Sequence, residues 1–130
     1  MIPYRGGPRA SLKVWEVLRV KRNWCRSLVA IIDYNKLQSL GTVENTLGLE
    51  PLVDKLKAFG SKVIEVDGHN HNQLYDAMTT KFPGKPLIVV AHTIKGKGVS
   101  FMQNKVEWHY KNPNDQDLSL ALDELVAIDA

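Results

Sequence analysis

Several residue types and patterns that mark secreted or membrane proteins are scarce in this sequence. Its single cysteine, Cys25, excludes an internal disulfide framework and favours a reducing compartment. The longest uninterrupted apolar run covers residues 28–32, far short of the ~20 residues that span a bilayer. Charged residues break up the first 26 residues, which therefore lack the apolar core of a signal peptide. We expect a cytoplasmic protein that does not enter a membrane.

Acidic residues are scarce at the N-terminus, where basic residues are concentrated. Residues 1–28 hold seven Lys and Arg against one acidic residue, whereas residues 29–130 hold ten Lys and Arg against thirteen Asp and Glu. This shift divides the chain into a divergent basic leader, residues 1–27, and a domain over residues 28–130. The leader could bind nucleic acid, but a solvated helix face is commoner, and no recognised nucleic-acid-binding module accompanies the charge.

From residue 28 onward, short apolar runs alternate with helical patterns, as is typical of parallel βαβ units. The patterns predict strands over residues 28–32, 62–66 and 86–91. The first and last of these are continuously apolar, which suits a sheet buried on both faces. Helical spacing predicts three helices, carrying Leu49 to Phe59, Leu74 to Met78, and Leu118 to Leu125. Pro51 and Gly60 mark the ends of the first helix, and Asn70 is placed to cap the second. We predict an α/β fold, a three-layer parallel sheet with flanking helices.

Two loops leave the carboxyl ends of predicted strands, where parallel sheets bind ligands. Asp33-Tyr34-Asn35 presents two oxygen-bearing side chains that suit Mg²⁺, although Asp and Asn also favour turns. Residues 93–98 combine lysines with glycines whose backbone amides can approach an anion, or they form a glycine turn with solvated lysines. His69 and His71, two positions apart in a turn, lack a third ligand, so we expect them to be structural or solvent-facing.

A long connection separates the last predicted strand from the last predicted helix. Residues 92–114 contain many cations and few apolar side chains. A connection of more than ~15 residues without a core of its own is usually functional or disordered. Within it, His109 follows Trp108 and is either a phosphate or substrate ligand or a surface histidine packed on the indole.

Taken in order, these motifs resemble transketolase, the thiamine-diphosphate enzyme of pentose sugar metabolism, and in particular its split N-terminal subunits. The resemblance covers residues 28–113 and is carried by LVAIIDYN, VDGHNH, HTIKGKGVSFM and WH. It implies a domain that binds thiamine diphosphate and Mg²⁺ for two-carbon ketol transfer between sugar phosphates. It also implies a C-terminal, pyrimidine-binding partner subunit, because the family's active site lies between two subunits. Sheet edges and apolar faces left uncovered favour self-association.

The resemblance assigns roles to four residues. Asn35 falls on the asparagine that binds Mg²⁺ through its side-chain oxygen, and Leu37 falls where a backbone carbonyl completes the metal shell. Lys95 falls on a lysine near the cofactor. His109 falls on the histidine that contacts the diphosphate and lies near the incoming sugar, so it is the candidate catalytic residue.

The match fails where the family's cofactor motif begins. That motif starts with Gly-Asp-Gly, whose aspartate binds Mg²⁺, but Arg5-Gly6-Gly7 stands here and Gly6 offers no carboxylate. The chain also lacks the family's upstream histidines and its pyrimidine-binding and C-terminal domains. We therefore expect a truncated component that is inactive alone. The alternative is a non-catalytic remnant or interaction subunit that keeps the fold but has lost the metal site.

Overall fold

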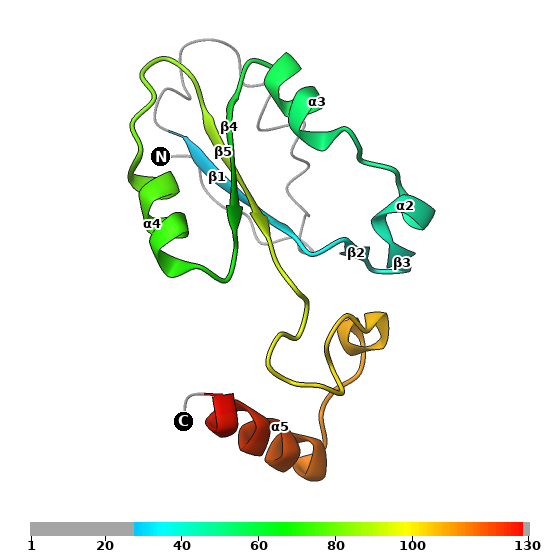
Figure 1. Ribbon diagram of the computed structural model, residues 1–130. Coiled ribbons are helices and arrows are strands. Elements are labelled where there is room, and N and C mark those ends of the chain that lie inside the picture. Colours follow the sequence, from blue (N-terminus) through cyan, green and yellow to red (C-terminus); the bar gives the residue numbers. More distant parts are fainter. Residues whose placement is uncertain (1–27, 129–130) are drawn as a thin grey trace, which may run out of the picture.

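The computed structural model of the chain describes residues 28–128, so the predicted basic leader over residues 1–27 lies outside the described residues. In the described part, three strands form a parallel sheet in the order β1-β5-β4 (Figure 1). Their bounds are β1 Val29–Tyr34, β4 Lys62–Asp67 and β5 Leu87–His92. Each strand begins within one residue of its predicted start, and the α/β fold class is confirmed.

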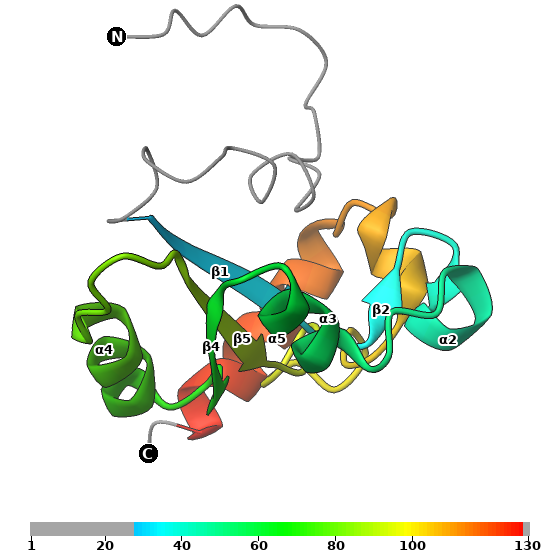
Figure 2. The same ribbon diagram turned by 90° about the horizontal axis from the view of Figure 1, so that it is seen from above.

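Helices cover both faces of this sheet (Figures 1 and 2). Helix α3 (Leu52–Ala58) packs on one face, where Leu56 joins Ile88 and Val90 in a buried cluster. Helix α4 (His71–Thr79) packs on the other face, where Ala77 joins Val89 in a second buried cluster. The predicted arrangement of three layers, with the sheet between helices, is therefore confirmed.

The residues expected to mark helix ends do so. The Asn70 side-chain oxygen accepts a hydrogen bond from the Gln73 amide at 3.1 Å and caps α4. Pro51 is the N-cap of α3, and Gly60 follows this helix with a φ of 91°, a conformation that glycine adopts without strain. Phe59 was expected on the apolar face of α3, but the helix ends at Ala58 and Phe59 is exposed.

Strand β1 is buried on one face only. Its residues Ala30 and Ile32 pack into the α3-side cluster, whereas Val29 and Ile31 face the α4 side and are 41% and 51% exposed. Helix α4 contacts β4 and β5, so it leaves this edge strand uncovered. The expectation that the 28–32 run is buried on both faces is therefore wrong within the described residues.

A small hairpin and a short helix connect β1 to α3. Strands β2 (Leu37–Gln38) and β3 (Gly41–Thr42) pair antiparallel, and α2 (Val43–Thr46) follows. Val43 is buried with Tyr34 in the α3-side cluster, which ties this connection to the sheet.

The long connection after β5 has a small core of its own, contrary to expectation. Val99 is buried, and the Trp108 indole N–H donates to the Phe101 carbonyl at 2.9 Å. The aromatic rings of Phe101 and Trp108 also lie in contact, with centroids 5.4 Å apart. A 3₁₀ helix, η1 (Val106–His109), completes this segment. The expectation that this connection lacks a core rested on its few apolar side chains. Trp108 packs against Phe101 and supplies much of the core.

The last predicted helix is present as α5 (Asp115–Ile128), which lies away from the sheet at the end of the C-terminal segment (Figure 1). Its predicted apolar stripe remains exposed at Leu118, Leu122 and Leu125. Glu124 joins the helix to the preceding segment by accepting hydrogen bonds from Ser100. None of the helices within residues 28–128 is long and apolar enough to cross a membrane.

Candidate cofactor site

The candidate site lies at the carboxyl edge of the sheet, where the loops after β1 and β5 leave side by side (Figure 1). These strands are paired in register, so that Asp33 lies opposite Ala91 and Tyr34 opposite His92. The Thr93 hydroxyl donates a hydrogen bond to the Asp33 carboxylate and joins the two loops. The sheet thus brings together two segments that are about sixty residues apart in sequence.

Asn35 opens a tight turn directly after β1. Its Oδ1 accepts a hydrogen bond from the Leu37 amide at 3.0 Å. Lys36, between them, has a φ of 65°, in the left-handed region that non-glycine residues rarely adopt. The Lys36 carbonyl accepts a bond from the Val43 amide at 2.9 Å. The local turn expected of Asp-x-Asn is therefore present, and an amide oxygen with a second lone pair can still bind a metal.

All four residues with predicted roles line one pocket. Asn35 and Leu37 come from the turn after β1, Lys95 comes from the loop after β5, and His109 comes from the end of η1. The pocket has a volume of about 590 Å³. Among the lining residues, His109 Nε2 lies 3.4 Å from the Ser39 hydroxyl oxygen, which ties the C-terminal segment to the β2–β3 hairpin. The fold therefore gathers residues from three separate segments.

The chemistry of this lining suits an anion better than a bare metal ion. Lys95 and His109 are its ionisable groups, and no carboxylate stands among its described lining residues. Within residues 28–128, no group of three or more His, Cys, Asp or Glu could hold a metal ion. The Arg5-Gly6-Gly7 segment, where the family has its aspartate, lies outside the described residues. Neutral oxygens beside cationic groups match a metal ion that arrives with phosphate.

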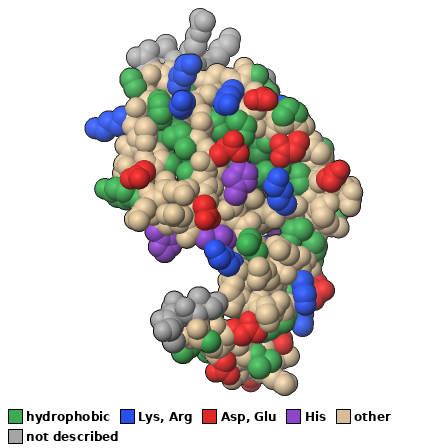
Figure 3. Space-filling model, viewed as in Figure 1, with side chains coloured by type: hydrophobic (Ala, Val, Ile, Leu, Met, Phe, Trp, Pro, Cys, Tyr) green, Lys and Arg blue, Asp and Glu red, His purple; other side chains and the backbone are tan. Residues whose placement is uncertain are grey.

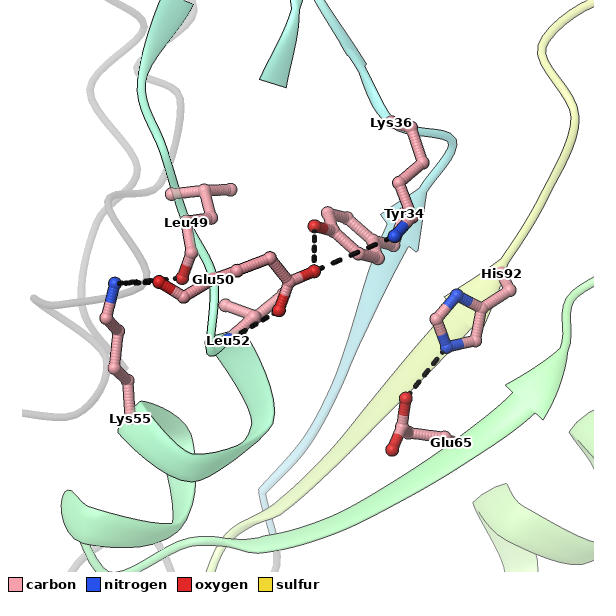
Figure 4. Close-up of polar contacts among 8 residues, drawn as sticks. All are labelled: Tyr34, Lys36, Leu49, Glu50, Leu52, Lys55, Glu65 and His92. Atoms are coloured by element: carbon pink, nitrogen blue, oxygen red, sulfur yellow. Dashed lines mark hydrogen bonds and ion pairs between the residues drawn. The ribbon is translucent and has the colours of Figure 1, made fainter. Parts of the chain in front are cut away.

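Sequence reasoning missed one residue beside the site, Glu50. The Tyr34 hydroxyl donates to Glu50 Oε1 at 2.6 Å, and the Lys36 Nζ lies 3.7 Å from the same oxygen (Figure 4). Burial, followed by the hydrogen bond and negative charge of Glu50, raises the pKa of Tyr34 to about 12. The bond from Tyr34, followed by one from the Leu52 amide, lowers the pKa of Glu50. Tyr34 is therefore protonated and Glu50 ionised at neutral pH.

Histidines gather near the carboxyl edge of the sheet, as Figure 3 shows. His92 Nε2 lies 2.9 Å from Glu65 Oε2 on the neighbouring strand (Figure 4). The His69 ring nitrogen Nε2 accepts a hydrogen bond from the Ile94 amide at 2.8 Å, and His71 is exposed. His69 thus contacts the loop after β5, and His71 faces the solvent.

The architecture defines an α/β domain of the kind found in transketolase. The crystal structure of transketolase from Campylobacter jejuni matches it with a TM-score of 0.65 and 20% sequence identity. The match covers 75% of this chain and 16% of that chain. At this identity the likeness establishes the fold alone.

Sequence comparison finds relatives that are named as subunits of transketolases. One subunit of the apulose-4-phosphate transketolase from Actinobacillus succinogenes is 41% identical over 100 residues, which cover 76% of this chain and 36% of the relative. The 6-deoxy-6-sulfo-D-fructose transketolase subunit of a Clostridium species is 39% identical over 100 residues, 75% of this chain and 36% of the relative. No family model matches the sequence. The chain is similar to these transketolase subunits and spans about a third of their length, and the predicted resemblance is confirmed.

Proposed function

We propose that the chain is a transketolase component that binds thiamine diphosphate and Mg²⁺ for two-carbon ketol transfer between sugar phosphates. The observation that carries this proposal is the single pocket lined by Asn35, Leu37, Lys95 and His109. The resemblance assigns a role to each of these residues separately. Their presence in one pocket supports a common function. Relatives named as subunits of transketolases support the same conclusion.

Each pocket residue has a distinct role in this proposal. The Asn35 side-chain oxygen and the Leu37 backbone carbonyl would be neutral ligands for Mg²⁺, a hard cation that commonly shares its shell with phosphate oxygens. The Lys95 ammonium would balance the negative charge of the diphosphate. His109 would donate a hydrogen bond to the diphosphate and orient the incoming sugar. The cofactor, when bound, supplies the carbon–carbon bond chemistry.

The pocket would be half of a complete site. Mg²⁺ in phosphate sites usually takes one or two carboxylates, and none stands among the described lining residues. Apolar side chains of β1 and α5 remain exposed in the described chain, which favours contact with other chains. We propose that the partner is a C-terminal, pyrimidine-binding transketolase subunit, with additional self-association, in the cytoplasm.

Titration calorimetry tests the proposal. Thiamine diphosphate is titrated into the purified chain, with and without Mg²⁺, alone and with a C-terminal transketolase subunit. We expect Mg²⁺-dependent binding that Asn35→Ala abolishes. Asn45→Ala removes the same amide group from an exposed position of α2 outside the pocket and should bind as the unaltered chain does. Equal affinities of all three proteins would refute the assigned role of Asn35.

A non-catalytic remnant or interaction subunit is the second candidate function. Gly6 favours it, because it stands where the family has a metal-binding aspartate. Gly6→Asp separates the two functions. If the unaltered chain binds no cofactor and Gly6→Asp restores Mg²⁺-dependent binding, the metal site of this chain is vestigial.

A further inference from the structure

The Glu50 carboxylate connects the two residues that flank Asn35. Its Oε1 accepts a hydrogen bond from the Tyr34 hydroxyl at 2.6 Å and lies 3.7 Å from the Lys36 Nζ (Figure 4). Tyr34 ends β1, and Lys36 forms the turn that follows. We propose that Glu50 is a positioning residue that fixes the turn from Asn35 to Leu37 for cofactor binding, an inference that rests on the proposed function.

Glu50 is itself held firmly on the α3 side. Its Oε2 accepts a hydrogen bond from the Leu52 amide at 2.9 Å, at the start of α3. The Lys55 Nζ donates to the backbone carbonyls of Leu49 and Glu50, each at 3.0 Å (Figure 4). Helix α3 is anchored in turn by Leu56, whose side chain is fully buried. The Glu50 carboxylate therefore links the turn to a helix that is packed against the sheet.

The turn needs such support because its backbone is in a sparsely populated conformation. Lys36 has a φ of 65°, and a non-glycine residue keeps this conformation only where its surroundings hold it. The Lys36 Nζ also lies 4.8 Å from the centroid of the Tyr34 ring, which adds a second contact across the turn. Within this same turn, Asn35 Oδ1 accepts a hydrogen bond from the Leu37 amide. The positions of the Asn35 side-chain oxygen and the Leu37 carbonyl therefore depend on one backbone shape.

The role of Glu50 in the turn is separable from a role in overall stability. Its side chain is 60% exposed, so truncating it opens no cavity in the core. Ion pairs of exposed side chains contribute little to global stability. Residues that orient metal ligands, in contrast, commonly change metal affinity by about 10- to 100-fold when they are removed. The effect of truncation should therefore be local to the turn.

Two measurements on the full chain test this role, amide hydrogen exchange at Leu37 and Mg²⁺-dependent affinity for thiamine diphosphate. In Glu50→Ala we expect the Leu37 amide to exchange about tenfold faster, because the turn opens locally. Cofactor affinity should fall about 10- to 100-fold. Glu50→Gln keeps an oxygen that accepts a hydrogen bond from the Tyr34 hydroxyl but loses the charge beside Lys36, so it should recover part of both losses. Glu44→Ala removes a carboxylate that lines the neighbouring pocket without bonding to the turn and should change neither.

Unchanged exchange at Leu37 in Glu50→Ala overturns the proposal, because the turn then keeps its shape without the carboxylate. Ala77→Gly, which weakens α4 on the opposite face of the sheet, controls for overall stability. If it accelerates Leu37 exchange as much as Glu50→Ala does, the effect is global and the proposal is also overturned. Absence of cofactor binding by the unaltered chain refutes the proposed function alone, since the exchange rates still decide whether Glu50 holds the turn.

Discussion

Gly68 lies where the turn after β4 presses against the start of the loop after β5. Its amide donates to the His92 carbonyl at 2.8 Å. A Cβ on Gly68 would lie 3.1 Å from the Ala91 Cβ and 3.2 Å from the His92 carbonyl oxygen, and closer still to the Thr93 Cγ2. We therefore predict that Gly68→Ala destabilises the fold by forcing these two segments apart.

The size of this effect follows from how Thr93 is held. Its hydroxyl donates to the Asp33 carboxylate, so rotating the side chain away from an added Cβ would break that bond. Shifting the backbone would disturb the bond from Gly68 to the His92 carbonyl instead. Overpacking of this kind costs about 1–3 kcal/mol. Since about 1 kcal/mol shifts the Tm by roughly 4–8 °C for domains of about 60–100 residues and by roughly 2–4 °C for those of about 150–250 residues, the change is measurable.

Urea and thermal unfolding of the full chain provide the assay. Gly48→Ala is the matched control, because a Cβ there meets nothing within 4 Å. The double variant Gly68→Ala/Thr93→Ser removes the crowded Cγ2 and keeps the hydroxyl, so it should recover much of the lost stability. Equal stability of the Gly68→Ala and Gly48→Ala variants, or no recovery in the double variant, would refute the reasoning.

The strands show what an apolar run can and cannot predict. Residues 87–91 and 28–32 are both continuously apolar, and both form parallel strands as expected. The first run occupies the centre of the sheet and is fully buried, whereas the second occupies an edge of the described sheet and exposes Val29 and Ile31. Composition reports that a segment prefers burial. Whether another segment covers the strand depends on tertiary packing. A local sequence pattern does not contain that information.

The candidate site, like the strands, could be predicted from the sequence only in part. Local residue patterns left the roles of Asn35 and His109 open, and resemblance to a family supplied them. The structure brings both residues to one pocket. Glu50 was missed because its partner Tyr34 lies sixteen residues away and its signal, a glutamate before Pro51, is also that of an ordinary helix start. The fold decides which side chains from different elements come within hydrogen-bond distance, and a local sequence pattern does not contain this information.

The remaining predictions concern the core and the C-terminal helix. Leu56→Ala removes a fully buried side chain and should lower the free energy of unfolding by about 2–5 kcal/mol in urea titrations. Leu40→Ala, at an 84% exposed position, should stay within about 0.5 kcal/mol of the unaltered chain, and similar losses in both would contradict the observed core. Glu124 accepts hydrogen bonds from the Ser100 amide at 2.5 Å and hydroxyl at 2.7 Å, and these bonds lower its pKa below the usual 4.5. Because a carboxylate with a lowered pKa stabilises the folded state only while ionised, the attachment of α5 should hold above that usual value. It should weaken as the pH falls through the lowered pKa, which amide exchange at Ser100 would report. In Glu124→Gln the Ser100 amide should have little protection from exchange, relative to its intrinsic rate, at every pH. Asp123→Asn changes a neighbouring exposed residue and should keep the pH dependence of this protection. Exchange at Ser100 that follows the same pH profile in the Glu124→Gln variant as in the unaltered chain would show that another group anchors the helix.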